Sequence, residues 1–277
     1  MPRLNIREAL SQGRELLQSA GAVEPGLNAE VLLAHAMRCD RVYFFAHPEQ
    51  ELREVEWIHY GRYLHERMQG KPTQYITQKQ EFYGRDFRVT PDVLIPRPET
   101  ELLVEAVLER RSGARVMVDV GTGSGAIAVT LALELGRPVA AVDISAGALN
   151  VAAANAARLG ARVRFAQGDL LHCFGDAVAD VVVSNPPYVA TGEAAAMQRE
   201  VRDWEPHLAL FAGDSGLNIY KQLAPEAWRV LKPGGLLAME IGFGQADAVT
   251  SLLGDWTGVR VLPDLAGIPR VVVCEKR

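Results

Sequence analysis

The residues best suited to chemistry in this sequence are Asn185, Pro186, Pro187 and Tyr188, which directly follow a short apolar segment. Two adjacent prolines stiffen the backbone and remove two N–H donors, so nearby carbonyl oxygens stay free to accept hydrogen bonds. Asn185 adds a side-chain amide oxygen, and Tyr188 adds a flat aromatic face. These residues predict a corner that grips a planar –NH2 group.

Such a grip would prepare a weak nucleophile. The nitrogen of an amide or an aromatic amine reacts poorly because its lone pair is delocalised. Hydrogen bonds from its two N–H groups to Asn185 Oδ1 and the Pro186 carbonyl would direct that lone pair outward. In-line attack of that nitrogen on an electrophilic carbon would then need positioning more than a strong base.

A glycine-rich segment, Gly121-Thr122-Gly123-Ser124-Gly125, comes where a predicted strand passes into a predicted helix. Glycines allow a tight turn and close approach to a ligand, and a helix N-terminus offers free N–H groups. Asp143 ends the next predicted strand, 18 residues later, where a carboxylate would accept hydrogen bonds from a ribose diol. The segment satisfies the G-x-G-x-G pattern of S-adenosylmethionine (SAM) sites and also the G-x-G-x-x-[GA] pattern of NAD sites. It therefore predicts an adenosine-containing cofactor of either kind.

The surrounding chain alternates strands and helices from residue 99 onward. Short connections between such elements imply a mostly parallel sheet with helices on both faces, an α/β fold. Strands are predicted at 115–120, 138–142, 162–166, 180–184, 236–241, 259–262 and 270–274, and helices at 126–135, 146–159 and 217–231.

The first part of the chain has a different pattern. Apolar positions at three-to-four spacing predict a helical bundle over residues 1–73, with Asn28 as the cap of the second helix. Residues 74–98 alternate and are rich in β-formers, with Gly84 in a turn, which predicts a β-hairpin linker. The third domain is then 99–277.

Composition narrows the class of protein. The 277 residues carry a net charge of −5, and the first 90 are balanced, with 12 basic and 12 acidic side chains. No basic domain is evident, which argues against nucleic acid as the main partner. Apolar runs of at most five residues, no signal-peptide pattern at the start and three dispersed cysteines predict a soluble, cytoplasmic protein without a disulfide framework or a metal site.

Beyond these features, the chain resembles the PrmC (HemK) family of release factor glutamine methyltransferases. The resemblance rests on Leu94-Ile95-Pro96-Arg97-Pro98-Glu99-Thr100-Glu101, Asp119–Gly125, Asp143 and Asn185–Tyr188, in this order behind a helical front domain. It implies a Rossmann-like, mostly parallel seven-stranded sheet and the cofactor SAM, with S-adenosylhomocysteine as product. The implied reaction methylates the glutamine amide (N5) in the Gly-Gly-Gln loop of class 1 peptide-chain release factors, which modulates translation termination.

The resemblance also implies roles for individual residues. Asn185, Pro186 and Tyr188 would be catalytic, and Asn185 to Tyr188, including Pro187, would bind the glutamine amide. The front domain would dock the release factor. Separately from the resemblance, we expect the protein to be a monomer. Some relatives carry Trp in place of Leu170, so stacking on adenine would be weaker here. Phe82, or alternatively Tyr83, and Arg97 to Glu101 would close the pocket. The implied cofactor contacts are Gly121, Thr122, Gly123, Ser124, Gly125, Asp143, Asp169, Leu170, Asn185, Phe82 and Arg97.

Four other functions share parts of the pattern. An adenine-N6 methyltransferase of DNA or RNA would use the same grip, but a base-flipping enzyme needs a basic groove. A glutamine methyltransferase of a ribosomal protein would share the catalytic motifs and differ around Ile95–Glu101. A non-catalytic nucleotide-binding scaffold is disfavoured because every implied active-site position is filled, and an NAD oxidoreductase would have no use for Asn-Pro-Pro-Tyr.

Overall fold

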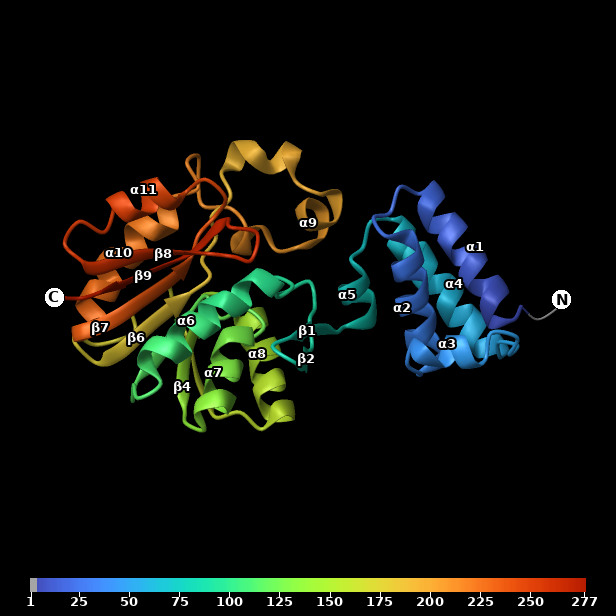
Figure 1. Ribbon diagram of the computed structural model, residues 1–277, viewed down its shortest axis with the longest axis horizontal. Helices are drawn as coiled ribbons and strands as arrows, with labels where there is room; N and C mark the ends of the chain where they lie inside the picture. The colour runs from blue at the N-terminus through green and yellow to red at the C-terminus, as the bar shows by residue number, and fades with distance from the viewer. Residues whose placement is uncertain (1–3) are drawn as a thin grey trace. The chain divides into compact units, whose positions relative to one another are not determined.

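The computed structural model describes residues 4–277, which form two compact units (Figure 1). The first unit contains the described residues up to Lys79 together with Gln198–Trp204, and the second contains Gln80–Met197 and Glu205–Arg277. The sequence pattern predicts boundaries at residues 73 and 98, and it gives no sign that residues 198–204 pack with the helical part.

The first unit is a small helical bundle. Its core consists of apolar side chains from three long helices, such as Leu17, Leu33 and Leu64. The first helix begins at a capping box, in which Asn5 Oδ1 accepts from the Glu8 amide and the Glu8 carboxylate accepts from the Asn5 amide. The helices are α1 (Ile6–Ser19), α2 (Pro25–Met37), α3 (Val42–Ala46), α4 (Glu54–Met68), α5 (Thr73–Thr77) and α9 (Arg199–Trp204).

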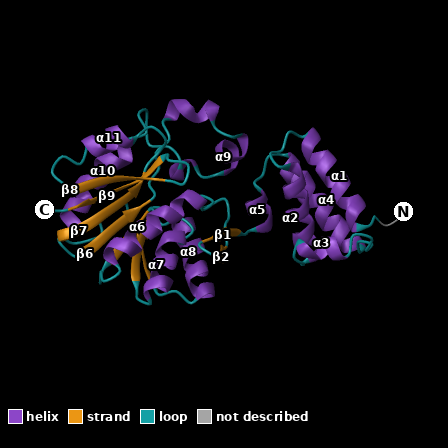
Figure 2. Ribbon diagram, in the orientation of Figure 1, coloured by secondary structure: helices purple, strands orange, loops and turns teal. Residues whose placement is uncertain are grey.

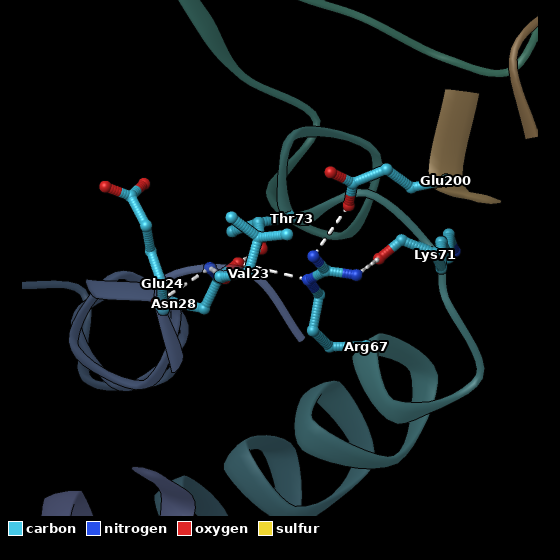
Figure 3. A network of polar contacts seen from close by, with 7 residues as sticks. All are labelled: Val23, Glu24, Asn28, Arg67, Lys71, Thr73 and Glu200. Atoms are coloured by element: carbon cyan, nitrogen blue, oxygen red, sulfur yellow. Dashed lines mark hydrogen bonds and ion pairs between the residues drawn. The ribbon is translucent and has the colours of Figure 1, made fainter. Parts of the chain in front are cut away.

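Asn28 has a different role from the predicted one. Helix α2 already begins at Pro25, so Asn28 lies in its first turn and the prediction of a cap is wrong. Its Nδ2 donates to the Val23 carbonyl at 2.8 Å, while its Oδ1 accepts from Arg67 Nε at 3.1 Å and from the Thr73 hydroxyl (Figure 3). One amide thus joins the loop before α2 to α4 and α5.

Helix α9 is held to the bundle by the same guanidinium. The Arg67 side chain is almost fully buried, and its Nη2 lies 2.6 Å from the Glu200 carboxylate (Figure 3). Lys71 Nζ lies 5.9 Å from the centre of the Trp204 ring, a cation–π contact. These long-range contacts explain why residues far along the chain belong to the first unit.

The second unit is built on a seven-stranded sheet with the order β5-β4-β3-β6-β7-β9-β8. The pairs from β5 to β7 are parallel, whereas β9 pairs antiparallel with β7 and β8. The strands are β3 (Met117–Val120), β4 (Val139–Asp143), β5 (Val163–Gln167), β6 (Ala179–Ser184), β7 (Leu231–Glu240), β8 (Thr257–Pro263) and β9 (Pro269–Glu275).

Helices cover both faces of this sheet (Figure 2). Alternate strand residues enter opposite cores, as Met117 and Val118 do. The predicted α/β architecture is therefore confirmed. Helices α6 (Glu101–Arg111), α7 (Ala126–Leu135) and α8 (Ala146–Leu159) pack on one face, and α10 (Asn218–Val230) and α11 (Ala246–Ser251) pack on the other.

Two local predictions are wrong. Residues 74–77 belong to helix α5, because Pro72 starts a turn that buries Tyr75 and Ile76. The sequence predicts that residues 232–235 separate a helix from a strand that begins at residue 236. In the structure this segment lies within strand β7, where an irregularity in its pairing with β6 accommodates the extra residues. The hairpin itself is present as β1 (Gln80–Phe82) and β2 (Arg85–Phe87).

Three short 3-10 helices complete the second unit: η1 (Pro98–Thr100), η2 (Thr191–Ala196) and η3 (His207–Ala209). Across residues 4–277, no helix combines the length and the apolar character that a membrane span requires.

Candidate functional site

The strand order places the two predicted motifs side by side. From β3 the sheet grows in one direction through β4 and β5, and in the other through β6 and β7. Loops that leave β3 and β6 therefore diverge, which opens a crevice at the carboxyl ends of these strands, the usual ligand site of such sheets. A cavity of about 210 Å3 lies there, lined by both the glycine-rich loop after β3 and Asn185 and Pro187 after β6.

The glycine-rich loop needs its glycines for two reasons. Gly121, Gly123 and Gly125 all have positive φ, at 70°, 54° and 82°, a region that side chains with a Cβ rarely adopt. At Gly125 there is also no room, because an added Cβ would lie 3.1 Å from Ala152 Cβ on α8. The loop thus lies tight against α8 and keeps its backbone open to the cavity.

Asp143 lies at the end of β4, as predicted, and lines the cavity. Its Oδ2 accepts from the Gly123 amide at 2.8 Å, and its Oδ1 accepts from the Ser145 amide at 2.9 Å. Each carboxylate oxygen accepts more than one hydrogen bond. Asp143 therefore holds the loop in place and keeps acceptor capacity for a diol.

A second carboxyl, Asp119, belongs to the motif Asp119–Gly125, but the sequence analysis assigned it no role; in the structure it holds the glycine-rich loop. Asp119 is fully buried, and its Oδ2 accepts from Thr122 Oγ1 at 2.7 Å and from the Ala128 amide at 3.1 Å. Burial raises the pKa of Asp119 to about 7. Its place at the start of the motif, one residue before the end of β3, was the signal for such a role.

The other wall of the cavity includes Asp169 and Leu170. Leu170 has a φ of +46°, an uncommon conformation for a residue with a side chain. Its side chain is half-buried and packs beside the core of the second unit. Leu170 thus offers the cavity an apolar surface.

Asn185 is held through its amide nitrogen. Its Nδ2 donates to Thr100 Oγ1 at 3.1 Å, and the Thr100 hydroxyl donates to Glu240 Oε2 at 2.6 Å. Among the residues that the structure describes, none donates a hydrogen bond to Asn185 Oδ1. The oxygen of Asn185 is therefore the atom available to a ligand.

The rest of the Asn-Pro-Pro-Tyr segment forms a rigid corner. Pro186 is buried and Pro187 lines the cavity. Tyr188 is half-buried beside the cavity-lining residues, and its carbonyl accepts from Gln245 Nε2 at 2.9 Å. Burial raises the pKa of the Tyr188 phenol to about 12. Tyr188 is thus a neutral ring at neutral pH and is unsuited to act as a base.

The segment before α6 contributes through Arg97 and Thr100, which both line the cavity. Arg97 Nη2 lies 2.5 Å from the Glu205 carboxylate, whose other oxygen accepts from the Ile95 amide at 3.2 Å. Glu205, which sequence reasoning also missed, is buried and joins this segment to the stretch before η3. Glu101 instead accepts from the Tyr83 amide at 2.8 Å and so anchors the β1–β2 turn.

Phe82 does not close the cavity. Its ring is fully buried and packs edge-on against Phe87, with ring centres 6.0 Å apart, inside the core that faces α6 and α7. The prediction for Phe82 is therefore wrong. Alternation along β1 correctly indicates that this side chain is buried, but it does not show which surface it covers.

The fold and the site together define a class. The chain resembles the hMettl16 catalytic domain solved with the MAT2A 3'UTR hairpin 6 (TM-score 0.57, 17% identity, 73% of this chain and 79% of that chain). It also resembles a methyltransferase from Pyrococcus furiosus (TM-score 0.53, 19% identity, 70% and 90%). These neighbours show a shared Rossmann-like α/β fold, and in this chain a cavity lies at the carboxyl ends of the parallel strands.

Sequence comparisons give the family. Residues 8–77 match the model of the PrmC N-terminal domain, and residues 98–209 match that of the methyltransferase small domain. The release factor glutamine methyltransferase of Koribacter versatilis is 51% identical over 99% of both chains, and that of Bacillus subtilis is 44% identical over 96% of both. This chain belongs to the release factor glutamine methyltransferase family.

Proposed function

We propose that this enzyme transfers the methyl group of SAM to the side-chain amide nitrogen of the glutamine in the Gly-Gly-Gln loop of class 1 release factors. The observation that carries the proposal is the placement of Asn185 and the glycine-rich loop on one cavity. Asn185 offers an amide oxygen there, because its nitrogen is held by Thr100.

The residues present fit SAM. The amides of the glycine-rich loop, Asp143 and the apolar surface of Leu170 match an amino-acid end, a ribose and an adenine in turn. When bound, SAM would supply a methyl group on a positively charged sulfur, and that sulfur would be the leaving group when a nitrogen lone pair bonds to the methyl carbon. We assign the loop Gly121–Gly125, Asp143, Asp169, Leu170 and Arg97 to cofactor binding.

The chain's own contribution to the reaction is positioning. Asn185 Oδ1 and the Pro186 carbonyl accept the two N–H groups of the glutamine amide and direct its lone pair away from them. As the nitrogen gains positive charge in the transition state, these acceptors bind its N–H groups more strongly. The nitrogen becomes acidic once the new N–C bond has formed, and its extra proton leaves to water without a protein base.

The helical unit would supply a docking surface for the release factor. Support comes from the match of residues 8–77 to the PrmC N-terminal domain. The second unit carries the described methyl-transfer site by itself, so the helical unit is left to serve recognition of the substrate.

A methyl-transfer assay tests the proposal. The purified protein is mixed with labelled SAM and, in parallel, with a class 1 release factor, its Gly-Gly-Gln→Gly-Gly-Ala variant and adenine-containing DNA. We expect label on the release factor's glutamine, located by mass spectrometry, and none on the variant. Label on DNA alone would preserve the reaction type and overturn the substrate, and label on neither would overturn the proposal.

A further inference from the structure

A buried chain of hydrogen bonds lies behind Asn185. Thr100, in η1 of the segment before α6, is 4% exposed, and Glu240, at the end of β7, is 3% exposed. Thr100 Oγ1 accepts from Asn185 Nδ2 at 3.1 Å and donates to Glu240 Oε2 at 2.6 Å. The Asn185 side chain also lowers the pKa of the Glu240 carboxyl. Three segments that are far apart in the sequence thus meet at one amide.

We propose that Thr100 and Glu240 are positioning residues that hold the Asn185 side chain with its oxygen, and not its nitrogen, available to the substrate amide. The inference rests on the proposed function, because only a substrate that donates N–H groups needs the oxygen of Asn185. Neither Thr100 nor Glu240 has to touch the reacting nitrogen for this role.

The chemistry of the Thr100 hydroxyl and the Glu240 carboxylate explains why the Asn185 amide is held in one of its two orientations. An ionised carboxylate only accepts hydrogen bonds, so Glu240 requires a donor from each neighbour. Thr100 has a single hydroxyl proton and gives it to Glu240, which leaves its lone pairs to accept from Asn185. An Asn185 rotated by 180° would place its oxygen against Thr100 Oγ1, whose proton already goes to Glu240, and would lose the hydrogen bond to Thr100.

Protonation of Glu240 would remove this selection. A carboxylic acid donates as well as accepts, so Thr100 could turn its proton toward Asn185 and favour the rotated amide. Burial raises the pKa of Glu240 to about 7, with Glu99 raising it further and Arg270 lowering it. The other ionisable side chains coupled to this carboxylate are Tyr188 and Tyr220, whose pKa values are raised, so both are neutral near pH 7.

The test compares matched variants of the full chain over a range of pH. Thr100→Val keeps the shape and loses the hydroxyl, whereas Thr100→Ser keeps the hydroxyl. Glu240→Gln removes the titration. The control is Thr130→Val, because Thr130 is fully buried on α7 and its hydroxyl has no hydrogen-bond partner among the described residues. Initial rates with a release factor give kcat and KM, and calorimetry gives the affinity for SAM.

We expect Thr100→Val to lower kcat by about tenfold to a hundredfold, with SAM affinity within about threefold of wild type, since a lost orienting hydrogen bond weakens the transition state. Thr100→Ser should recover most of the rate. The wild-type kcat should fall as the pH drops through about 7, and Glu240→Gln should flatten that fall.

Two results would overturn the inference: a Thr100→Val enzyme as fast as Thr130→Val, or a Glu240→Gln enzyme with the wild-type pH profile. A general loss of folding would lower both the yield and the SAM affinity of Thr100→Val. Thr100→Ser separates this case from a lost positioning role, because it keeps the hydroxyl and should recover most of the rate. If wild-type protein fails to label the glutamine at all, the proposed function fails, whereas a labelled glutamine with unaltered variants defeats only the positioning role.

Discussion

Replacing Asn185 by alanine removes the acceptor that defines the site. The side chain is half-buried on the cavity wall, and its nitrogen makes the 3.1 Å bond to Thr100. The substrate amide would then have only the Pro186 carbonyl to accept its N–H groups. A preorganised hydrogen bond to a group that gains charge in the transition state contributes about 2–4 kcal/mol. At 1.36 kcal/mol per factor of ten, turnover should fall about 30-fold to about 1,000-fold.

The assay separates this effect from cofactor binding. Single-turnover methylation of a release factor at saturating SAM gives the rate of transfer, and calorimetry gives the affinity for SAM, which should change by less than about threefold because the glycine-rich loop is intact. Asn150→Ala, on the exposed face of α8, controls for the substitution itself. A near-normal rate in Asn185→Ala, or a loss that lies entirely in SAM affinity, would refute the amide grip.

Four further expectations follow from contacts elsewhere. Asp143→Ala should weaken SAM binding in calorimetry, because it removes the diol acceptor and frees the Gly123 amide, and unchanged affinity would refute the ribose assignment. Gly125→Ala should lower the free energy of unfolding in urea by about 1–3 kcal/mol more than Gly121→Ala, since both have positive φ but only the former meets α8. The pKa of Glu240 is raised from 4.5 to about 7, so folding favours its protonated form. The free energy of unfolding should therefore fall by about 3 kcal/mol as the pH rises from 4.5 to about 7. Measured as the difference between wild type and Glu240→Gln, this pH dependence should be absent above about pH 7. Arg67→Met should lower the free energy of unfolding by about 3 kcal/mol and speed hydrogen exchange in α9, since it unpairs Glu200; unchanged exchange there would count against the ion pair.

The alternating part of the fold was predictable because its signals are local. Buried parallel strands are short apolar runs, and Gly136 and Gly160 end α7 and α8 in the left-handed conformation that the sequence pattern marks. Residues 74–77 show where this reasoning fails. Their β-forming side chains enter a one-turn helix because burial of Tyr75 and Ile76 outweighs a weak intrinsic preference.

The residues of the candidate site also differ in how well the local sequence predicts them. Three features could each be recognised from a few consecutive residues: the glycine-rich loop, Asp143 and Asn185. The sheet topology then brings them to one edge of the sheet. Phe82 has the right residue type near the right motif, yet its strand directs it into the core. Residue type and neighbourhood predict function well only where the neighbouring element also sets the direction of the side chain.

Glu205 and Glu240 were beyond prediction for a different reason. Each is one carboxyl among 34 acidic residues, and each acts on a partner more than a hundred positions away: Glu205 on Arg97, and Glu240 on Thr100. Only the folded chain shows that a buried acceptor stands behind Asn185. If Glu240 selects the orientation of Asn185, a chain with the motif but without a buried acceptor behind it would present the nitrogen and oxygen of that asparagine with little preference.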